Sequence, residues 1–229
     1  MSDNLDIQFK KRILPNFISN IIYFSISLLV GIFLAPYFID TLGYSAYGLI
    51  PLATSLTTYV TWITDAISLP ISRYLTIDLQ QAKIKNAQIT YNTAIFGTMA
   101  IILVFIPFAI LLASISPSLF DIGNCNPEDV SLLFLLIFLS VLIRVWSNNF
   151  MIVLFAFNRL DQRNLINSTN LLIQIVLIVV LFTLLGPSLE YVGYAYLTSA
   201  IIALAISIYL SKKTASSPDG TPKEVKNII

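Results

Sequence analysis

The sequence predicts an all-α, polytopic membrane protein built as a bundle of six transmembrane helices. Of its 229 residues, 57% are hydrophobic and only 11% are charged, against about 25% charged residues in soluble domains. Six apolar runs are long enough to cross a bilayer. The chain has no histidine and one cysteine, Cys125, which excludes an intrachain disulfide and Ser-His or Cys-His catalysis within it. We therefore expect no enzyme activity, no metal site and no nucleic-acid partner.

The predicted spans are residues 13–38, 46–71, 90–113, 130–157, 167–185 and 192–210. The first apolar run is longer than the h-region of a signal peptide, so we interpret it as a span. Residues 1–12 are then a cytoplasmic N-terminal segment, and residues 13–211 form the six-helix bundle. Residues 212–229 are predicted to be a cytoplasmic linker toward a missing second half, because they are polar at first and end in TPKEVKNII, which is similar to the beginning of the chain.

The connections divide sharply by charge. None of the 13 basic residues lies in residues 39–45, 114–129 or 186–191, and only Arg144 lies inside a span. The positive-inside rule then predicts that both termini are cytoplasmic, in the inner membrane, with Cys125 in an outer loop. Tyrosines are expected to anchor the outer interface; these are Tyr37, Tyr44, Tyr47, Tyr191, Tyr194 and Tyr196.

A polar stripe runs along the second predicted span at steps of 4, 3, 4, 3 and 4 residues, which places it on one helical face: Thr54, Thr58, Thr61, Asp65, Ser68 and Ser72. A carboxylate inside a span is costly, so by default it faces a bundle interior or a wet cavity. We interpret this helix as one wall of a polar pathway, with Asp65, Thr61 and Ser68 as a coupling or gating site. Alternatively, the hydroxyls merely pack helices together or bond to their own backbone.

Three more spans carry polar stripes, which favours a shared hydrated interior. They are Asn16, Asn20, Tyr23, Ser27 and Gly31 in the first span, Ser140, Arg144, Ser147 and Asn148 in the fourth, and Arg163, Asn167, Asn170 and Gln174 at the fifth.

Arg144 is the strongest single signal, because it lies about 14 residues from either end of its span, ~20 Å deep. A central arginine costs at least about 2.5 kcal/mol unless it is paired or hydrated. Asp65 is expected ~9 Å deep, so an offset of ~11 Å leaves a direct salt bridge possible but not secure. The alternatives are an arginine that binds an anionic substrate and one that bonds only helix carbonyls.

Four segments resemble the polysaccharide flippases, the lipid-linked oligosaccharide translocases of the multidrug/oligosaccharidyl-lipid/polysaccharide exporter superfamily. They are LGYSAYGLIPLATSL, DAISLPISRYLT, NRLDQRNLINSTNLLIQ and YVGYAYLTSAIIALAISIYLSKK, and the resemblance covers residues 8–213. One departure is Asp65-Ala66-Ile67, where family members often have Asp-x-Gly-Leu.

The resemblance implies two six-helix bundles facing a central cavity, alternating access, and transport of a lipid-pyrophosphate-linked sugar from the inner to the outer leaflet. This chain supplies one bundle, the N-terminal half, and its expected partners are membrane lipids, the lipid-linked oligosaccharide, and a second half or a second copy. Arg144 is expected to bind the pyrophosphate and Asp65 to use H⁺ or Na⁺, with no other cofactor. The sugar is expected to contact Asn20, Asn148, Asn167, Asn170 and Gln174. The alternatives are a drug or metabolite exporter of the same superfamily, an inactive or scaffold membrane fragment, and an intramembrane enzyme.

Overall fold

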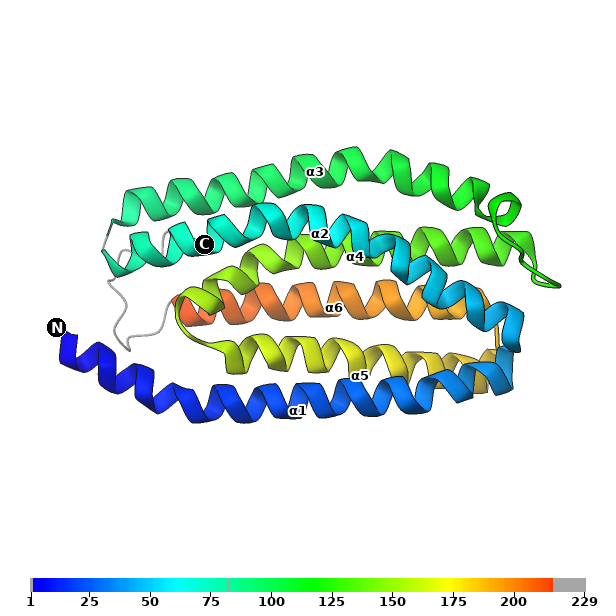
Figure 1. The fold of residues 1–229 in the computed structure, drawn as a ribbon, viewed down its shortest axis with the longest axis horizontal. Helices are drawn as coiled ribbons and strands as arrows, with labels where there is room; N and C mark the ends of the chain where they lie inside the picture. The colour runs from blue at the N-terminus through cyan, green and yellow to red at the C-terminus, as the bar shows by residue number, and fades with distance from the viewer. Residues whose placement is uncertain (1, 82, 216–229) are drawn as a thin grey trace.

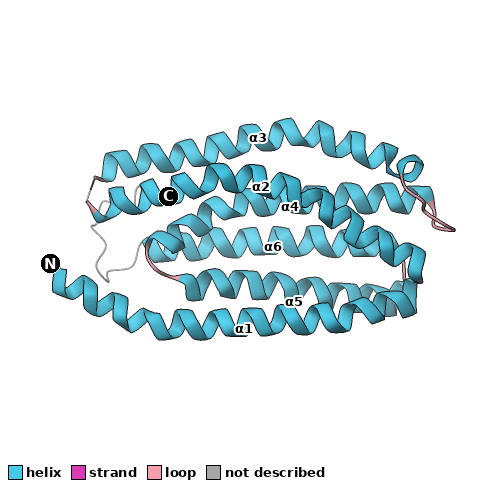
Figure 2. Cartoon of the chain, in the orientation of Figure 1, coloured by secondary structure: helices cyan, strands magenta, loops and turns pink. Residues whose placement is uncertain are grey.

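The chain folds into six long helices that run back and forth along one axis (Figure 1). The computed structural model describes residues 2–81 and 83–215. The helices are α1 (Ser2–Leu42), α2 (Tyr44–Gln80), α3 (Ile84–Leu119), α4 (Pro127–Ala156), α5 (Leu160–Leu185) and α6 (Leu189–Ala215). Figure 2 shows only helices and short loops in the described part of the chain. The predicted all-α, six-helix fold is therefore confirmed.

Five of these helices are long and apolar enough to cross a membrane by length and composition. They are α1 over Arg12–Leu42, α3, α4, α5 and α6. The remaining helix, α2, has 37 residues and is long enough to span. Its threonines, serines and Asp65 lower its hydropathy, so the polar stripe predicted to be functional also weakens the membrane signal of α2.

Most helices extend beyond the predicted spans. α2 continues to Gln80, past the predicted end at residue 71, and α1 begins at Ser2. Residues 2–12, predicted as a separate segment, therefore continue α1. Of the predicted linker, residues 212–215 belong to α6, and residues 216–229 lie outside the described part of the chain.

Three features of the sequence around the start of α4 favour a helix N-terminus. The side chain of Asn126 accepts a hydrogen bond from the backbone N–H of Glu128, Pro127 occupies the first helical position, and Glu128 and Asp129 lie in the first turn. Proline tolerates this position because its missing N–H would be unbonded there, and carboxylates interact favourably with the positive end of the helix dipole. The start of α4 is thus fixed by local sequence.

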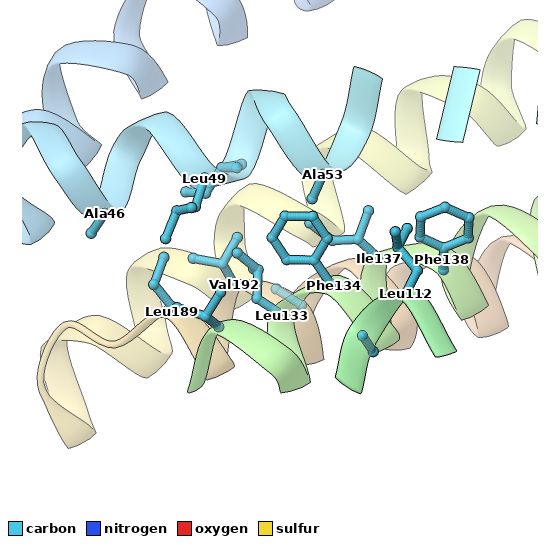
Figure 3. Close-up of a cluster of buried hydrophobic side chains, with 14 of the residues drawn as sticks. Ala46, Leu49, Ala53, Leu112, Leu133, Phe134, Ile137, Phe138, Leu189 and Val192 are labelled. Carbon is cyan, nitrogen blue, oxygen red and sulfur yellow. The ribbon is translucent and has the colours of Figure 1, made fainter. Parts of the chain in front are cut away.

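α4 is the central helix of the bundle. It packs against α2, α3 and α6, while α6 also packs against α5, and α1 lies against α5 at the edge. Figure 3 shows part of the main hydrophobic core, in which side chains of α2, α3, α4 and α6 meet. The residues labelled there are Ala46, Leu49, Ala53, Leu112, Leu133, Phe134, Ile137, Phe138, Leu189 and Val192.

Buried polar pairs link the helices around this core. The Ser147 hydroxyl on α4 donates to the Ser207 hydroxyl on α6 over 2.9 Å. Thr98 on α3 donates to Asn149 on α4 over 3.3 Å, and Thr214 on α6 donates to Gln162 on α5 over 2.8 Å. Hydrogen bonds of this kind contribute about 0.6 to 2 kcal/mol each between membrane helices. Small polar side chains therefore hold α3, α4, α5 and α6 together.

The bundle has one basic end and one acidic end. The basic end, at the left of Figure 1, carries Arg73, Lys83, Lys85, Arg159, Arg163, Lys212 and Lys213. The opposite end carries Asp40, Asp121, Glu128, Asp129 and Glu190, and no basic residue among those that the structure describes. The alternation of the six helices thus reproduces the charge separation read from the sequence, whereas the orientation in the membrane stays a prediction.

Gly193 on α6 packs closely against α4, which yields a first prediction. A Cβ at Gly193 would lie 2.9 Å from Leu136 Cδ1, 3.0 Å from Leu136 Cβ and 3.4 Å from Leu133 Cα. Gly193→Ala should therefore lower the free energy of unfolding by roughly 1 to 3 kcal/mol through overpacking. Thermal unfolding of the purified protein in one detergent checks this. Gly97→Ala is the control, because nothing lies within 4 Å of its new Cβ, and an unfolding midpoint no lower for Gly193→Ala than for this control would contradict the prediction.

Cys125 in the loop between α3 and α4 gives a test of orientation. Burial, with a smaller contribution from the Asp129 carboxylate, raises the pKa of the Cys125 thiol above its ordinary value. Since the thiolate is the reactive form, a membrane-impermeant maleimide should label Cys125 in intact cells slowly at neutral pH. The labelling rate should keep rising at pH values where an ordinary thiol has already ionised. Labelling that requires permeabilised cells would show the opposite orientation.

Candidate functional site

The most buried helix leaves one face open. Beyond its first turn, α4 has two exposed side chains, Arg144 and Phe155. Asn148 lies between them, and the spacings of four and seven residues place all three on one helical face. We call these three residues the open face of α4. Arg144 is the 18th of the 30 residues of α4, so it lies near the middle of the helix, as predicted.

The polar stripe of α2 borders this open face. The buried face of α2 contains Ala53, Thr57, Val60 and Thr64, each one residue before a member of the stripe. The stripe is consequently turned by about 100° from the buried face, and Asp65 is exposed. The polar residues of α2 therefore line an open side of the bundle and not its buried core, and the predicted hydrated interior stays a prediction.

Most hydroxyl hydrogens of the stripe are occupied by the backbone of α2. Thr58 donates to the carbonyl of Thr54, Thr61 to that of Thr58 over 2.7 Å, and Ser72 to that of Leu69. This is the backbone bonding that the sequence left open as an alternative. The hydroxyl oxygens retain lone pairs, so the stripe presents acceptors to whatever lies opposite.

A cavity of about 210 Å³ lies at the basic end between α2, α4 and the start of α5. We call it the basic-end pocket. Its lining is Asp65, Ser68, Leu69, Ser72, Asn148, Met151, Ile152, Phe155 and Arg163. The structure thus brings together Asp65, Ser68 and Asn148, three of the predicted site residues, and adds Arg163, which the sequence had marked only as one of the basic residues and a member of a stripe.

The pocket brings Asp65 and Asn148 to one cavity. α2 and α4 run in the same direction, and both residues line the cavity. Arg144 lies about one turn before Asn148 on α4 and does not line it. The offset of ~11 Å between Asp65 and Arg144 stays a prediction.

Asp65 and Arg144 form no ion pair. Among the described residues the structure contains one ion pair, between Arg159 Nε and Asp161 Oδ1 at 3.3 Å. Within the same residues, the side chains of Asp65, Arg144 and Arg163 have neither a hydrogen bond nor an ion pair. The direct salt bridge considered from the sequence is thus absent from this structure.

Arg144 instead has neutral polar neighbours. The phenol of Tyr196 on α6 lies beside Gln174 on α5 and within electrostatic reach of Arg144. The sequence had assigned Tyr196 to the outer interface as an anchor, whereas the structure places it half-buried next to a predicted substrate-binding residue. One turn before Gln174, the side-chain oxygen of buried Asn170 has no hydrogen-bond partner within the described chain.

The remaining candidates lie apart from the pocket. Asn20 on α1 is exposed and Asn167 on α5 is half-buried, and neither lines the cavity. Asn16 of the α1 stripe is structural: its amide nitrogen donates to the carbonyl and the side-chain oxygen of Asn158, and its oxygen accepts from the N–H of Asp161. No group of three His, Cys, Asp or Glu side chains that could hold a metal ion occurs in the described residues.

A comparison with curated proteins supports the membrane assignment. The chain is 26% identical over 199 residues to a protein of Bacillus subtilis (strain 168) described as "Uncharacterized membrane protein EpsK". The match covers 86% of this chain but 39% of that relative. The chain therefore spans well under half of the length of this relative. No protein-family model matches the sequence, and neither does a solved structure.

Proposed function

We propose that this chain is half of a membrane transporter that carries a lipid-linked oligosaccharide, a polysaccharide precursor, from the inner to the outer leaflet by alternating access. The observation that carries the proposal is Arg144, a charged side chain exposed midway along the central helix without an ion-pair partner in the described chain. An unpaired charge at this depth is costly, so intramembrane charges generally mark a substrate or ion path. The likeness to a membrane protein and the six-helix fold support a multi-pass membrane protein with such a role.

Arg144 supplies the chemistry that a pyrophosphate requires. Its guanidinium group presents several N–H donors in a planar fork that matches phosphate oxygens. Tyr196, within electrostatic reach of Arg144, and Gln174 beside Tyr196 add neutral groups that can donate to phosphate oxygens. In the proposed function these three residues bind the anionic head of the lipid carrier.

Four amide side chains on α4 and α5 are proposed to bind the saccharide. Asn148 lies one turn from Arg144, and Asn167, Asn170 and Gln174 follow one another along α5. The oxygen of Asn170 accepts no hydrogen bond within the described structure, but it is buried, so it could meet a sugar only after α5 or its neighbours move. Asn20 belongs to the proposed sugar contacts only if the sugar reaches α1.

Asp65 is proposed as the coupling or gating group, with Thr61 and Ser68 as neighbours on the stripe. Asp65 and Ser68 share the basic-end pocket, so a proton or Na⁺ entering from the basic end would meet the carboxylate there. The exporter alternative lacks comparable support: Asp65 is the one carboxylate in this pocket, and a cationic drug favours several. An inert scaffold gives no reason for Asp65, Arg144 and Arg163 to lie without ion-pair partners in the described chain.

A second bundle completes the proposed transporter. The open face of α4 and the stripe of α2 lie on an exposed side of this bundle, and the relative from Bacillus subtilis has more than twice the matched length. The opposite wall is either a second half or a second copy of this chain. In the proposed transporter the basic end faces the cytoplasm and the bundle lies in the inner membrane, an orientation that the charge separation supports through the positive-inside rule.

A prediction concerns the 229-residue chain by itself. Expressed in a strain that lacks its own flippase, it should not restore surface polysaccharide, because its polar side would face lipid instead of a second wall. Antibody staining of the cell surface measures this, with an intact flippase as the positive control and membrane insertion checked by fractionation. Restored polysaccharide would contradict the prediction and make a homodimer the transporting unit.

A further prediction tests Arg144 by binding. The purified chain should bind a polyprenyl pyrophosphate more tightly than the uncharged polyprenol, and Arg144→Ala should weaken the former by about 1.5 to 3 kcal/mol, the range for a charged hydrogen bond. Arg144→Lys should rescue binding only in part, since a point charge replaces a planar fork. Native mass spectrometry of the detergent complex measures both ligands.

The matched control for this experiment is Lys213→Ala, which removes a positive charge at the basic end, away from Arg144. This variant should bind both lipids as the unaltered chain does. Equal binding of pyrophosphate by Arg144→Ala and by the control would remove Arg144 from the proposed site.

A further inference from the structure

Arg163 is a charged residue of the basic-end pocket to which no role has been given. It lines the cavity from the start of α5, while Asp65 lines it from α2. Arg163 is half-buried and, within the described residues, forms no ion pair and no side-chain hydrogen bond. Two opposite charges therefore face one small cavity without touching.

The position of Arg163 is electrostatically unfavourable by local rules. It lies in the first turn of α5, which begins at Leu160. The N-terminal end of a helix carries a partial positive charge, so a cation there is disfavoured by typically 0.3 to 1 kcal/mol. Local helix stability therefore does not favour an arginine at this place. The positive-inside rule accounts for a basic residue at this end of the bundle, and a carboxylate that lines the same pocket gives this particular arginine a partner of opposite charge.

The two walls of the pocket belong to differently anchored helices. The start of α5 is tied to α1: Asn16 bonds to Asn158 and Asp161, and Asn164 donates to the Ser19 hydroxyl over 3.0 Å. α2 is held by α4 and α3, and within the described chain α2 and α5 make no extended packing contact. α5 is also held by the core, since Thr214 on α6 donates to Gln162, and Ile166 packs with Met151 and Leu154 of α4. A change in the width of the gap between α2 and α5 must therefore come from α2.

α2 also has a built-in point of flexibility beside Asp65. Pro70 lies inside the helix, and having no N–H it leaves the carbonyl of Ala66 without its helical hydrogen bond. Prolines of this kind are the usual sites at which helices bend. The segment of α2 beyond Asp65 can thus bend toward or away from α5.

We propose that Asp65 and Arg163 form an ion lock that closes the basic-end pocket. The cavity of about 210 Å³ has room for several water molecules, and in the present structure Asp65 and Arg163 form no ion pair across it. This is the open state of the proposed lock. When α2 approaches α5 and the water leaves, the carboxylate accepts hydrogen bonds from the guanidinium group, and this pairing offsets the desolvation of both. The lock rests on the proposed function in one respect, because a transporter requires an entrance that closes. The proposal assigns the closing of the basic-end pocket to Asp65 and Arg163.

Arg163 is the partner, rather than Arg144, for a geometric reason. Arg163 shares the cavity with Asp65, whereas Arg144 does not line it. Arg144 also lies about one turn further toward the middle of the bundle. A pair between Asp65 and Arg163 closes the basic-end mouth and leaves Arg144 available to the substrate.

The test measures access to a cysteine placed beyond the lock. In a Cys125→Ser background, Thr61→Cys puts a thiol one turn past Asp65 on the stripe. Vesicles whose outer surface is the basic end are treated with a membrane-impermeant maleimide, and the rate of labelling is measured. We expect Arg163→Gln and Asp65→Asn each to raise this rate by roughly fivefold or more. The double variant should be no faster than either single one, because both remove the same contact.

The controls separate the lock from general charge effects. Arg73→Gln removes a positive charge one residue after Ser72, outside the pocket lining, and should leave the labelling rate unchanged. The charge swap Asp65→Arg with Arg163→Asp should restore the slow rate. Additive effects of the two single variants, or an equal effect of Arg73→Gln, would overturn the lock.

A second measurement serves if the swapped variant does not fold. Cysteines at positions 65 and 163, again without Cys125, should be bridged in the membrane by bifunctional thiol reagents of both short and long reach, since the mouth both opens and closes. Bridging by the long reagent alone would overturn the proposal. Neither measurement requires transport, so an absence of saccharide export would count against the proposed function and leave the lock to be judged on these data.

Discussion

The site depends on one constraint, the burial of α4. This helix packs against α2, α3 and α6, so nearly every direction around it is occupied. Beyond its first turn only Arg144 and Phe155 remain exposed, and they mark the single direction left open. A guanidinium group in the middle of a membrane helix can be tolerated only where water, an anion or a carboxylate can reach it. The packing of the core therefore decides where polar chemistry is possible, and the stripe of α2 borders the same opening.

The same packing explains how the bundle stays together beside a polar opening. Between membrane helices, lipid supplies no strong hydrophobic driving force, so close packing and interhelical hydrogen bonds must hold them. Gly193 lets α6 approach α4 closely, and the Ser147–Ser207 hydrogen bond joins the same two helices. Some buried polar residues thus bond across helices and stabilise the fold, others, such as Ser140, bond to the backbone of their own helix, and Asn170 keeps an unbonded oxygen within the described chain.

Much of the fold could be predicted from the sequence, because a membrane imposes simple rules. Hydropathy and length located all six helices, and the distribution of basic residues placed both ends of the described chain at one end of the bundle. Site geometry was harder to predict. The period of the α2 stripe showed that its residues share one face of the helix. A period does not say whether that face points into the bundle, and the buried face is made by the residues one position earlier, Ala53, Thr57, Val60 and Thr64. Arg163 was missed as a neighbour of Asp65 because no pattern within a helix says which helix lies opposite.

The arrangement of α1, α2 and α5 bears on the proposed lock. The beginning of α5 is bonded to α1 through Asn16 and Ser19, and to α6, where Thr214 donates to Gln162. α2 makes no extended packing contact with α5 within the described chain, so a bend of α2 at Pro70 is the movement that would change the width of the basic-end pocket and the separation of Asp65 and Arg163. Because Arg144 lies on the central helix α4, such a bend leaves it in place, as the proposed alternating access requires of a binding site.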